Sequence, residues 1–388
     1  MNTLPTSAIQ AAQRLVRLES YLQADPNNNA LRVDAFETAL AANNWPHAQI
    51  HLQQGLAALG DELGWALREG DFWLAQQRYD DAWRVLQALL HRPPPSAEFS
   101  DVLLHNLGFV QYIQGQYEAC VALLAQRLEG NAAPGRTTPT AAWGSLQMLW
   151  LRALHQTQQL SRAHTWALAE EQQSRLTPQT AGVAALVALD ADDLPSAQRW
   201  AAIALTPEYA PIAQLEAWVA QASLALGAND PPQAQACAGR ALQLRPNDGR
   251  AWSAQAFADL LNQNMDKAQA SFERAVTAMP GHIGTWLGLA WTQLMRRDLP
   301  DAQKQFEHAL ALDRNFGESH GGLAVALALQ GQVDMAREHM ERALRLDPGS
   351  LSGQYAQALL NGEAQDVASF QRLVQRLLAK QGVVPVKR

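Results

Sequence analysis

The chain has 388 residues, 48% of them hydrophobic and 17% charged, so it has enough apolar material for a large folded core but is too long for one compact core. Several domains or a repeat array are therefore expected. The net charge of −7, with basic residues scattered along the chain, argues against a nucleic-acid partner, because binding a phosphate backbone needs clustered Lys and Arg.

Cysteine usage and apolar runs narrow the class of protein further. Only two cysteines occur, Cys120 and Cys237, and neither has a His or Cys companion at metal-ligand spacing. Neither a disulfide framework nor a zinc module is expected. The first residues lack a basic stretch followed by an apolar core, and the longest apolar run, residues 183–189, is too short to cross a bilayer. We expect a cytoplasmic protein with no membrane insertion, and the Arg-rich, Lys-poor composition indicates a bacterial source.

A lone amphipathic helix is the first element expected. Residues 8–22 carry its pattern, which ends before Pro26, and we assign residues 1–28 to an N-terminal capping helix. From residue 29 onwards, a small residue recurs at the start of every second predicted helix, where it would let two helices approach closely. This small-residue series is Ala48, Ala82, Cys120, Ala163, Ala197, Ala234, Ala268, Ala302 and Ala336.

The intervals of the small-residue series divide the chain into three stretches. They are 34, 38, 43, 34, 37, 34, 34 and 34 residues, and the three longer intervals coincide with loop-like insertions at residues 92–96, 131–139 and 206–211. We therefore expect degenerate repeats 1–3 over residues 29–134, divergent repeats 4–5 over residues 135–214, and regular repeats 6–9 over residues 215–350.

The regular stretch repeats with a period of 34 residues. Trp252 recurs as Trp286, and Phe272 recurs as Phe306 and then Met340. Within each block, apolar residues fall three, four and seven positions apart, which predicts two amphipathic helices. The short break between them predicts a hairpin. We interpret the recurring tryptophans as packing residues between helices.

These blocks resemble the tetratricopeptide repeat (TPR), a helical hairpin of about 34 residues. The segment Asn106-Leu107-Gly108, followed by Gly115-Gln116-Tyr117, is similar to the middle of the family pattern. The resemblance covers residues 29–350. It implies an all-α fold, a right-handed superhelical solenoid of about nine TPR-like helical hairpins with terminal capping helices.

Capping helices are also expected after the array, over residues 351–381. An apolar stripe predicts one of them and consists of Val367, Phe370, Leu373, Val374, Leu377 and Leu378. Residues 382–388 are expected to form a frayed tail.

The family resemblance implies that the first helices line a concave groove. The positions that map to this groove are Phe109, Tyr112, Ile113, Phe257, Leu261, Trp291, Leu294, Met295, Val325 and Leu329. They are largely apolar and aromatic, a composition enriched where proteins bind proteins. Packing against the next hairpin is the alternative interpretation for each of them. We therefore expect a scaffold or adaptor that binds a partner peptide or amphipathic helix.

Some family members hold a terminal carboxylate with Lys and Asn pairs on their first helices. The matching positions here are Arg250, Ser253, Leu287, Gly321 and Val325, which include no Lys and no Asn. A hydrophobic or amphipathic segment is therefore the better hypothesis for the partner.

Motifs for catalysis or metal binding are weak. The phosphate-binding G-x-x-x-x-G-K-[ST] pattern and the H-E-x-x-H pattern are both missing. His47 and His51 lie four residues apart on one predicted helix, but the sequence offers no third ligand at a defined spacing. Asp190, Asp192 and Asp193 are interpreted as helix-capping and solubilising residues. We expect no enzymatic activity, no cofactor and no metal.

Three alternatives remain open at this point. One is a ligand- or peptide-gated regulator whose superhelix closes on a small ligand, with the insertion at residues 131–139 as its hinge. Another is a non-catalytic targeting subunit of an enzyme complex, because such solenoids resemble the arms of glycosyltransferases. The third is a homo-oligomer that forms through exposed terminal stripes.

Overall fold

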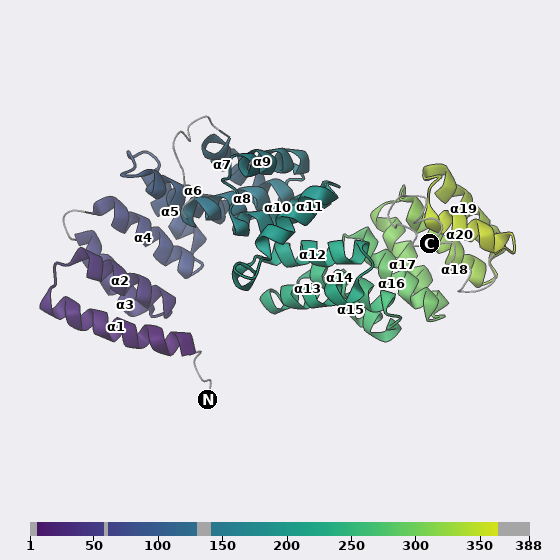
Figure 1. The fold of residues 1–388 in the computed structure, drawn as a ribbon, viewed down its shortest axis with the longest axis horizontal. Coiled ribbons are helices and arrows are strands. Elements are labelled where there is room, and N and C mark those ends of the chain that lie inside the picture. The colour runs from purple at the N-terminus through teal and green to yellow at the C-terminus, as the bar shows by residue number, and fades with distance from the viewer. Residues whose placement is uncertain (1–5, 58–60, 130–140, 364–388) are drawn as a thin grey trace. The chain divides into compact units, whose positions relative to one another are not determined.

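The computed structural model describes residues 6–57, 61–129 and 141–363. Within these ranges every regular element is helical: twenty α-helices and one short 3-10 helix, with no strand (Figure 1). The all-α fold predicted from the sequence is therefore confirmed. The chain falls into two compact units, Met1–Thr180 (unit 1) and Ala181–Arg388 (unit 2), and each is described by itself.

Unit 1 consists of one leading helix and four helical hairpins. Its helices are α1 (Thr6–Ala24), α2 (Asn29–Ala41), α3 (Trp45–Ala57), α4 (Glu62–Ala75), α5 (Tyr79–Leu89), α6 (Ala97–Ile113), α7 (Tyr117–Leu128), α8 (Ala141–Gln156) and α9 (Leu160–Gln172).

Unit 2 continues the same alternation, and its first helix begins at the unit boundary. Its elements are α10 (Pro178–Asp190), α11 (Leu194–Ala204), η1 (Ala210–Ile212), α12 (Leu215–Gly227), α13 (Pro231–Leu244), α14 (Gly249–Leu261), α15 (Met265–Ala278), α16 (Ile283–Met295), α17 (Leu299–Leu312), α18 (Gly317–Leu329), α19 (Val333–Leu346) and α20 (Leu351–Leu360). We call the first helix of each hairpin its A helix and the second its B helix.

Each hairpin reverses direction at one residue with positive φ. These turn residues are Asn43, Gln77, Gly115, Gln158, Asp192, Asn229, Gln263, Arg297 and Gly331, with φ between 54° and 79°. A left-handed residue at this point ends the A helix and redirects the chain. Five positions after every turn residue comes a member of the small-residue series, and all of its members are fully buried. The series therefore marks the seam between A and B helices in each described pair.

A repeated hydrogen bond ties the hairpins of unit 2 together. Trp252, Trp286, His320 and Gln354 follow one another at intervals of 34 residues, and each bonds the backbone oxygen six residues earlier. The bond joins an A helix to the end of the preceding B helix. It supports the interpretation of Trp252 and Trp286 as structural residues.

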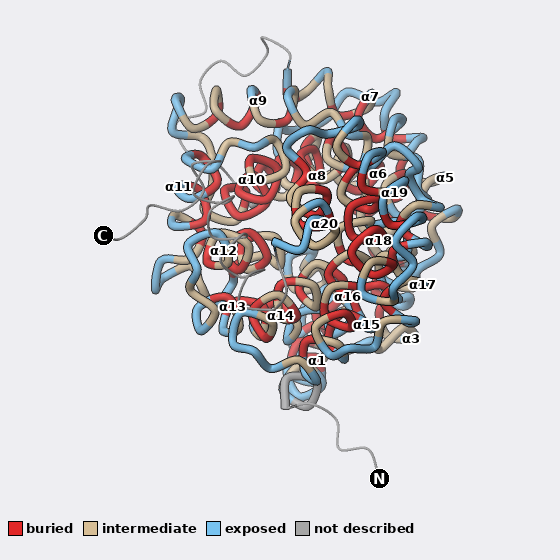
Figure 2. Tube along the Cα trace, turned by 90° about the vertical axis from the view of Figure 1, so that its right-hand side faces the viewer, coloured by how far each residue is buried: buried red, intermediate tan, exposed pale blue. Residues whose placement is uncertain are grey.

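In unit 2 the A helices have more buried residues than the B helices that follow them. In α18, for example, ten of the described residues are buried, whereas α19 has three (Figure 2). Partly exposed side chains on an A helix are consequently few, and they are the natural place to look for a binding site.

The predicted N-terminal capping helix corresponds to α1, which packs against α2. Leu15, Leu18 and Leu22 form its buried face, each no more than 8% exposed. At the other end, α20 lies within the predicted C-terminal capping region. The apolar stripe at residues 367–378, the tail at 382–388 and the insertion at 131–139 lie outside the described residues.

Candidate functional site

One position recurs on the A helices, six residues before the turn residue, and it is at least partly exposed except at Leu186 and Val325, which are buried. We call it the A-face position. In unit 1 it is occupied by Glu37, Asp71, Phe109 and Arg152, and in unit 2 by Leu186, Ser223, Phe257, Trp291 and Val325. The position is therefore mostly charged in unit 1 and mostly apolar in unit 2.

A pocket of about 290 Å³ lies between A helices of unit 2. We call it the α10–α14 pocket, because α10, α12 and α14 supply most of its wall. Its apolar lining is Leu189, Val219, Leu226, Ala254, Phe257 and Met279, and its polar lining is Asp190, Ser223, Arg250, Ser253 and His282. An apolar wall with a few convergent polar groups is the usual composition of a binding site.

An ion pair lies in the α10–α14 pocket. Arg250, in the first turn of α14, donates from Nη1 to Asp190 Oδ1 at 3.0 Å, and its Nη2 lies 2.8 Å from Asp190 Oδ2. Asp190 is the last residue of α10, so the pair joins two A helices that are separated by a whole hairpin. The side chains keep 41% and 23% of their accessible surface for Arg250 and Asp190. Solvent can therefore reach both charges.

His282 is the third polar group of the pocket that can carry charge. It is the N-cap of α16, and its Nδ1 accepts a hydrogen bond from the backbone N–H of Thr285 at 3.2 Å. Partial burial lowers the pKa of His282; the nearby Arg250 cation lowers it further, and the Asp190 carboxylate opposes both. At neutral pH the formal charges lining the pocket are therefore those of Arg250 and Asp190.

The ten predicted groove residues differ in how far they are exposed to solvent. Ile113, Leu261 and Leu329 are exposed to 46%, 47% and 36%, whereas Phe109, Tyr112, Phe257, Trp291 and Met295 are half-buried. Of these, Phe257 alone lines the α10–α14 pocket.

Two of the predicted groove residues are core residues in this structure. Val325 is fully buried and Leu294 is 8% exposed, and both belong to one core cluster of unit 2. Gly321 lets α18 approach α20 so closely that a Cβ there would lie 2.4 Å from the backbone nitrogen of Gly353. This close approach explains why side chains on α18 are covered, and it corrects the expectation that Val325 and Leu294 line an open groove.

Sequence reasoning missed the role of Asp190. It placed Asp190 with Asp192 and Asp193 in one capping cluster, but the three residues have different roles. Asp193 does cap α11, accepting from the backbone N–H of Ser196 at 3.2 Å, and Asp192 is the turn residue with φ of 59°. Asp190 instead pairs with Arg250. No local pattern indicates a partner 60 residues away in the chain.

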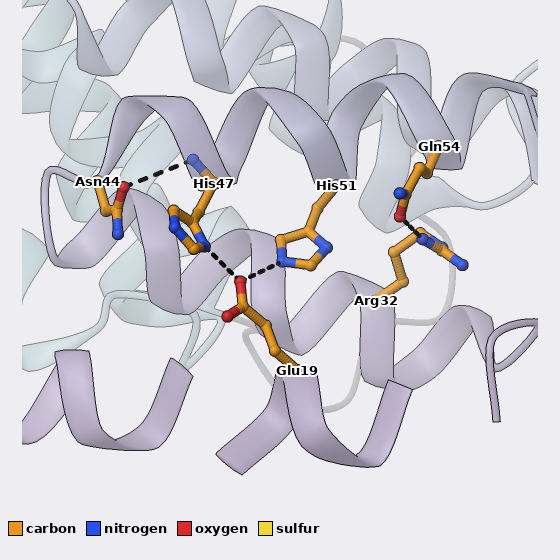
Figure 3. Close-up of polar contacts among 6 residues, drawn as sticks. All are labelled: Glu19, Arg32, Asn44, His47, His51 and Gln54. Carbon is orange, nitrogen blue, oxygen red and sulfur yellow. Dashed lines mark hydrogen bonds and ion pairs between the residues drawn. The ribbon is translucent and has the colours of Figure 1, made fainter. Parts of the chain in front are cut away.

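A second polar cluster joins the capping helix α1 to α3. Glu19 Oε1 lies 2.5 Å from His47 Nδ1 and 3.2 Å from His51 Nε2 (Figure 3). Burial lowers the pKa of His51, and the hydrogen bond to Glu19 opposes that effect. The spacing of the two histidines could not identify this partner, because Glu19 comes from another helix. In the parts of the chain that are described, no group of three or more His, Cys, Asp or Glu could hold a metal ion.

A polar network surrounds Asp71, the residue at the A-face position of α4. Asn106 Nδ2 donates to Asp71 Oδ1 at 2.6 Å, and His105 Nδ1 lies 3.2 Å from Asn106 Oδ1. Burial raises the pKa of Asp71 to about 6, although the Asn106 hydrogen bond opposes this. Unit 1 therefore presents hydrogen-bonding groups where unit 2 presents apolar surface.

Comparison with known proteins identifies the repeat. The family model described as tetratricopeptide repeat matches residues 219–283 and 287–350, which span α12 to α19. No curated protein sequence matches the chain. No helix in the described ranges is long and apolar enough to cross a membrane.

Solved structures resemble the chain at low sequence identity. The Cut9-Hcn1 hetero-tetramer of the APC/C is 12% identical with a TM-score of 0.46, covering 95% of this chain and 82% of that chain. MamA is 15% identical with a TM-score of 0.36, covering 42% of this chain and 92% of its own. YrrB, titled a TPR protein with an unusual peptide-binding site, is 18% identical with a TM-score of 0.34, covering 44% and 87%. Likeness at this level carries no functional argument.

Proposed function

We propose, from the match of residues 219–283 and 287–350 to the tetratricopeptide repeat, that the chain is a protein-interaction scaffold which binds a partner segment on the A helices of unit 2. The observation that carries this proposal is the α10–α14 pocket, in which Phe257 and Arg250 lie on one accessible surface. Aromatic residues and Arg are the residue types that contribute most to binding energy at protein interfaces.

The size of the pocket favours a peptide side chain over an enclosed metabolite. Its volume of about 290 Å³ is near the lower limit of sites that enclose a small ligand, which is about 300 Å³. A side chain of a bound segment would fill it while the rest of the segment lay along neighbouring A helices. Leu261, 47% exposed at the end of α14, and the half-buried Met295 at the end of α16 offer further apolar contacts there.

Truncation of this surface tests the proposal. We would use the full chain as bait in an extract of the source organism, and compare wild type with Phe257→Ala and Leu261→Ser by quantitative mass spectrometry. Both variants should lose a protein that wild type enriches. Leu244→Ala is the matched control, because Leu244 is 56% exposed at the end of the B helix α13.

The comparison requires that each variant keeps the helical circular dichroism of wild type. Equal enrichment of every protein by wild type, Leu244→Ala and the two pocket variants would contradict binding on the A helices of unit 2.

A further inference from the structure

We propose that Asp190 occupies the place of a partner carboxylate, and that the α10–α14 pocket receives an amphipathic segment whose own carboxylate replaces Asp190 on Arg250. This inference rests on the proposed function, because it names the chemistry of the segment that unit 2 binds.

The geometry of the ion pair is that of a carboxylate receptor. Both Nη atoms of Arg250 face both oxygens of Asp190, at 3.0 and 2.8 Å, in the two-pronged arrangement that a guanidinium forms with a carboxylate. The two residues come from helices two hairpins apart, and the pair lies on the pocket wall instead of in the seam of one hairpin. Any carboxylate that entered the pocket would meet the same two donors.

The neighbouring surface indicates the rest of the partner segment. Phe257 follows Arg250 by seven residues, two turns along α14, and both line the pocket. A segment with a carboxylate on Arg250 would therefore place an apolar side chain of the same face against Phe257. This is the spacing of acidic and apolar residues on one face of an amphipathic helix.

Exchange of one carboxylate for another is energetically easy at this site. The Arg250 and Asp190 side chains are 41% and 23% exposed, and water screens an ion pair that is exposed to this degree. Replacing Asp190 leaves Arg250 paired, while burial of the partner's apolar side chain favours the complex. A segment with a neutral residue at the same position gains no such pairing.

His282 reports on the exchange without taking part in it. The Asp190 carboxylate raises the pKa of His282, opposing burial and the Arg250 cation. Removing that carboxylate should lower the pKa of His282 further, and a partner carboxylate bound to Arg250 should raise it again.

The experiment uses fluorescein-labelled peptides of about four helical turns and the full chain. Three peptides share one apolar face, have amidated ends and carry Glu, Gln or Lys at one position; a fourth carries Gln and a free terminal carboxylate. Fluorescence anisotropy measures their Kd for wild type, Asp190→Asn and Arg250→Gln. Asp266→Asn is the matched control, because Asp266 is 91% exposed, pairs with Arg296 and does not line the pocket.

We expect the Glu peptide to bind wild type more tightly than the Gln peptide. Asp190→Asn should lower the Kd of the Glu peptide about fivefold, because the substitution removes a weakly held competitor. Arg250→Gln should abolish the preference for Glu over Gln. In the Asp190→Asn variant, the pKa of His282 measured by NMR should rise when the Glu peptide is added. Tighter binding of the peptide with the free terminal carboxylate than of the Glu peptide would support the same Arg250 site and show that the partner's carboxylate is a chain terminus.

The inference is overturned if Asp190→Asn binds the Glu peptide no better than wild type or Asp266→Asn does, or if the Lys peptide binds wild type most tightly. If wild type binds all the peptides equally and Phe257→Ala weakens that binding, the inference is overturned but the proposed function remains. Failure of every peptide to bind would count against both.

Discussion

Units 1 and 2 contain the same hairpin but present different A-helix surfaces. In both units a left-handed turn residue precedes a fully buried small residue by five positions. The A-face position nevertheless changes from Glu37 and Asp71 in unit 1 to Phe257 and Trp291 in unit 2. The seam and the turn define the hairpin, so the A-face can vary without loss of the fold. The residues at the A-face position, and not the repeat pattern, therefore indicate what each unit can bind.

Tryptophan has two structural roles in this chain. Trp65 and Trp150 of unit 1 are fully buried in its core, at 1% and 0% exposure. In unit 2, Trp252 and Trp286 lie half-buried at hairpin edges, where each donates its indole N–H to a proline carbonyl at 2.8 Å. Tryptophan is therefore a core residue at some positions, including Trp200 of unit 2 at 0% exposure, and a connection between hairpins at Trp252 and Trp286.

The largest expected effect tests this difference in tryptophan use. Trp65→Ala removes a side chain that packs edge-to-face on Phe36 at 5.8 Å and should lower the unfolding free energy of unit 1 by about 3–5 kcal/mol. Trp286→Ala removes one hydrogen bond and a half-buried ring and should cost unit 2 about 1–2 kcal/mol. Hydrogen exchange, measured helix by helix, separates the two units. Equal losses of unfolding free energy from Trp65→Ala and Trp286→Ala would contradict the two roles assigned to these tryptophans.

The next effect concerns the polar A-face of unit 1. The pKa of Asp71 is raised from 3.8 to about 6, so its charged form opposes folding above about pH 6, and stability is gained as pH falls and the carboxyl protonates. Asp71→Asn should therefore stabilise unit 1 at pH 7.5 by about 1–3 kcal/mol, because one pKa unit corresponds to about 1.4 kcal/mol. The gain should vanish near pH 4. A gain that is equal at both pH values would refute this assignment.

A smaller effect with the opposite dependence on pH is expected in unit 2. His320 Nδ1 and His339 Nδ1 lie 2.9 Å apart, and burial lowers the pKa of both side chains. Because their folded pKa values are depressed, stability is complete above the unfolded value of about 6.5 and is lost as pH falls below it.

Substitution of His320 should remove part of this acid sensitivity. His320→Gln introduces the residue that makes the equivalent bond at Gln354, whose Nε2 donates to Pro348 O at 3.0 Å. At about pH 5 the variant should lose less stability than wild type, as measured by hydrogen exchange of α18 and α19. Equal acid sensitivity of the variant and wild type would contradict this.

The smallest effect should be the same in both units. Gly115→Ala and Gly331→Ala should each cost about 1 kcal/mol, because both glycines have positive φ and a Cβ at either would meet no atom within 4 Å. Gln77→Gly and Arg297→Gly should each be neutral or stabilise by up to about 1 kcal/mol, since they relieve the same strain. Thermal unfolding measures all four. Unequal effects between the units would mean that their turns differ.

The candidate site was only partly predictable from the sequence. Phe257 was found because the repeat places it on an A helix, and Arg250 was noted for differing from a Lys and Asn clamp. Val325 was misplaced because its burial depends on how closely α18 approaches α20, which Gly321 determines through a contact outside its own hairpin. Asp190 was assigned to capping because its neighbours favour turns.

The sequence by itself determined the helices, the turns and the seams of the hairpins. These depend on residues within one repeat, where small seam residues, apolar spacing and the family pattern act over a few turns of chain. The tertiary structure alone decided which A-face residues remain accessible, and which charges meet. Arg250 pairs with Asp190, 60 residues earlier, because α10 and α14 both border the α10–α14 pocket. Tertiary packing of helices brings together side chains whose sequence separation carries no signal of their contact.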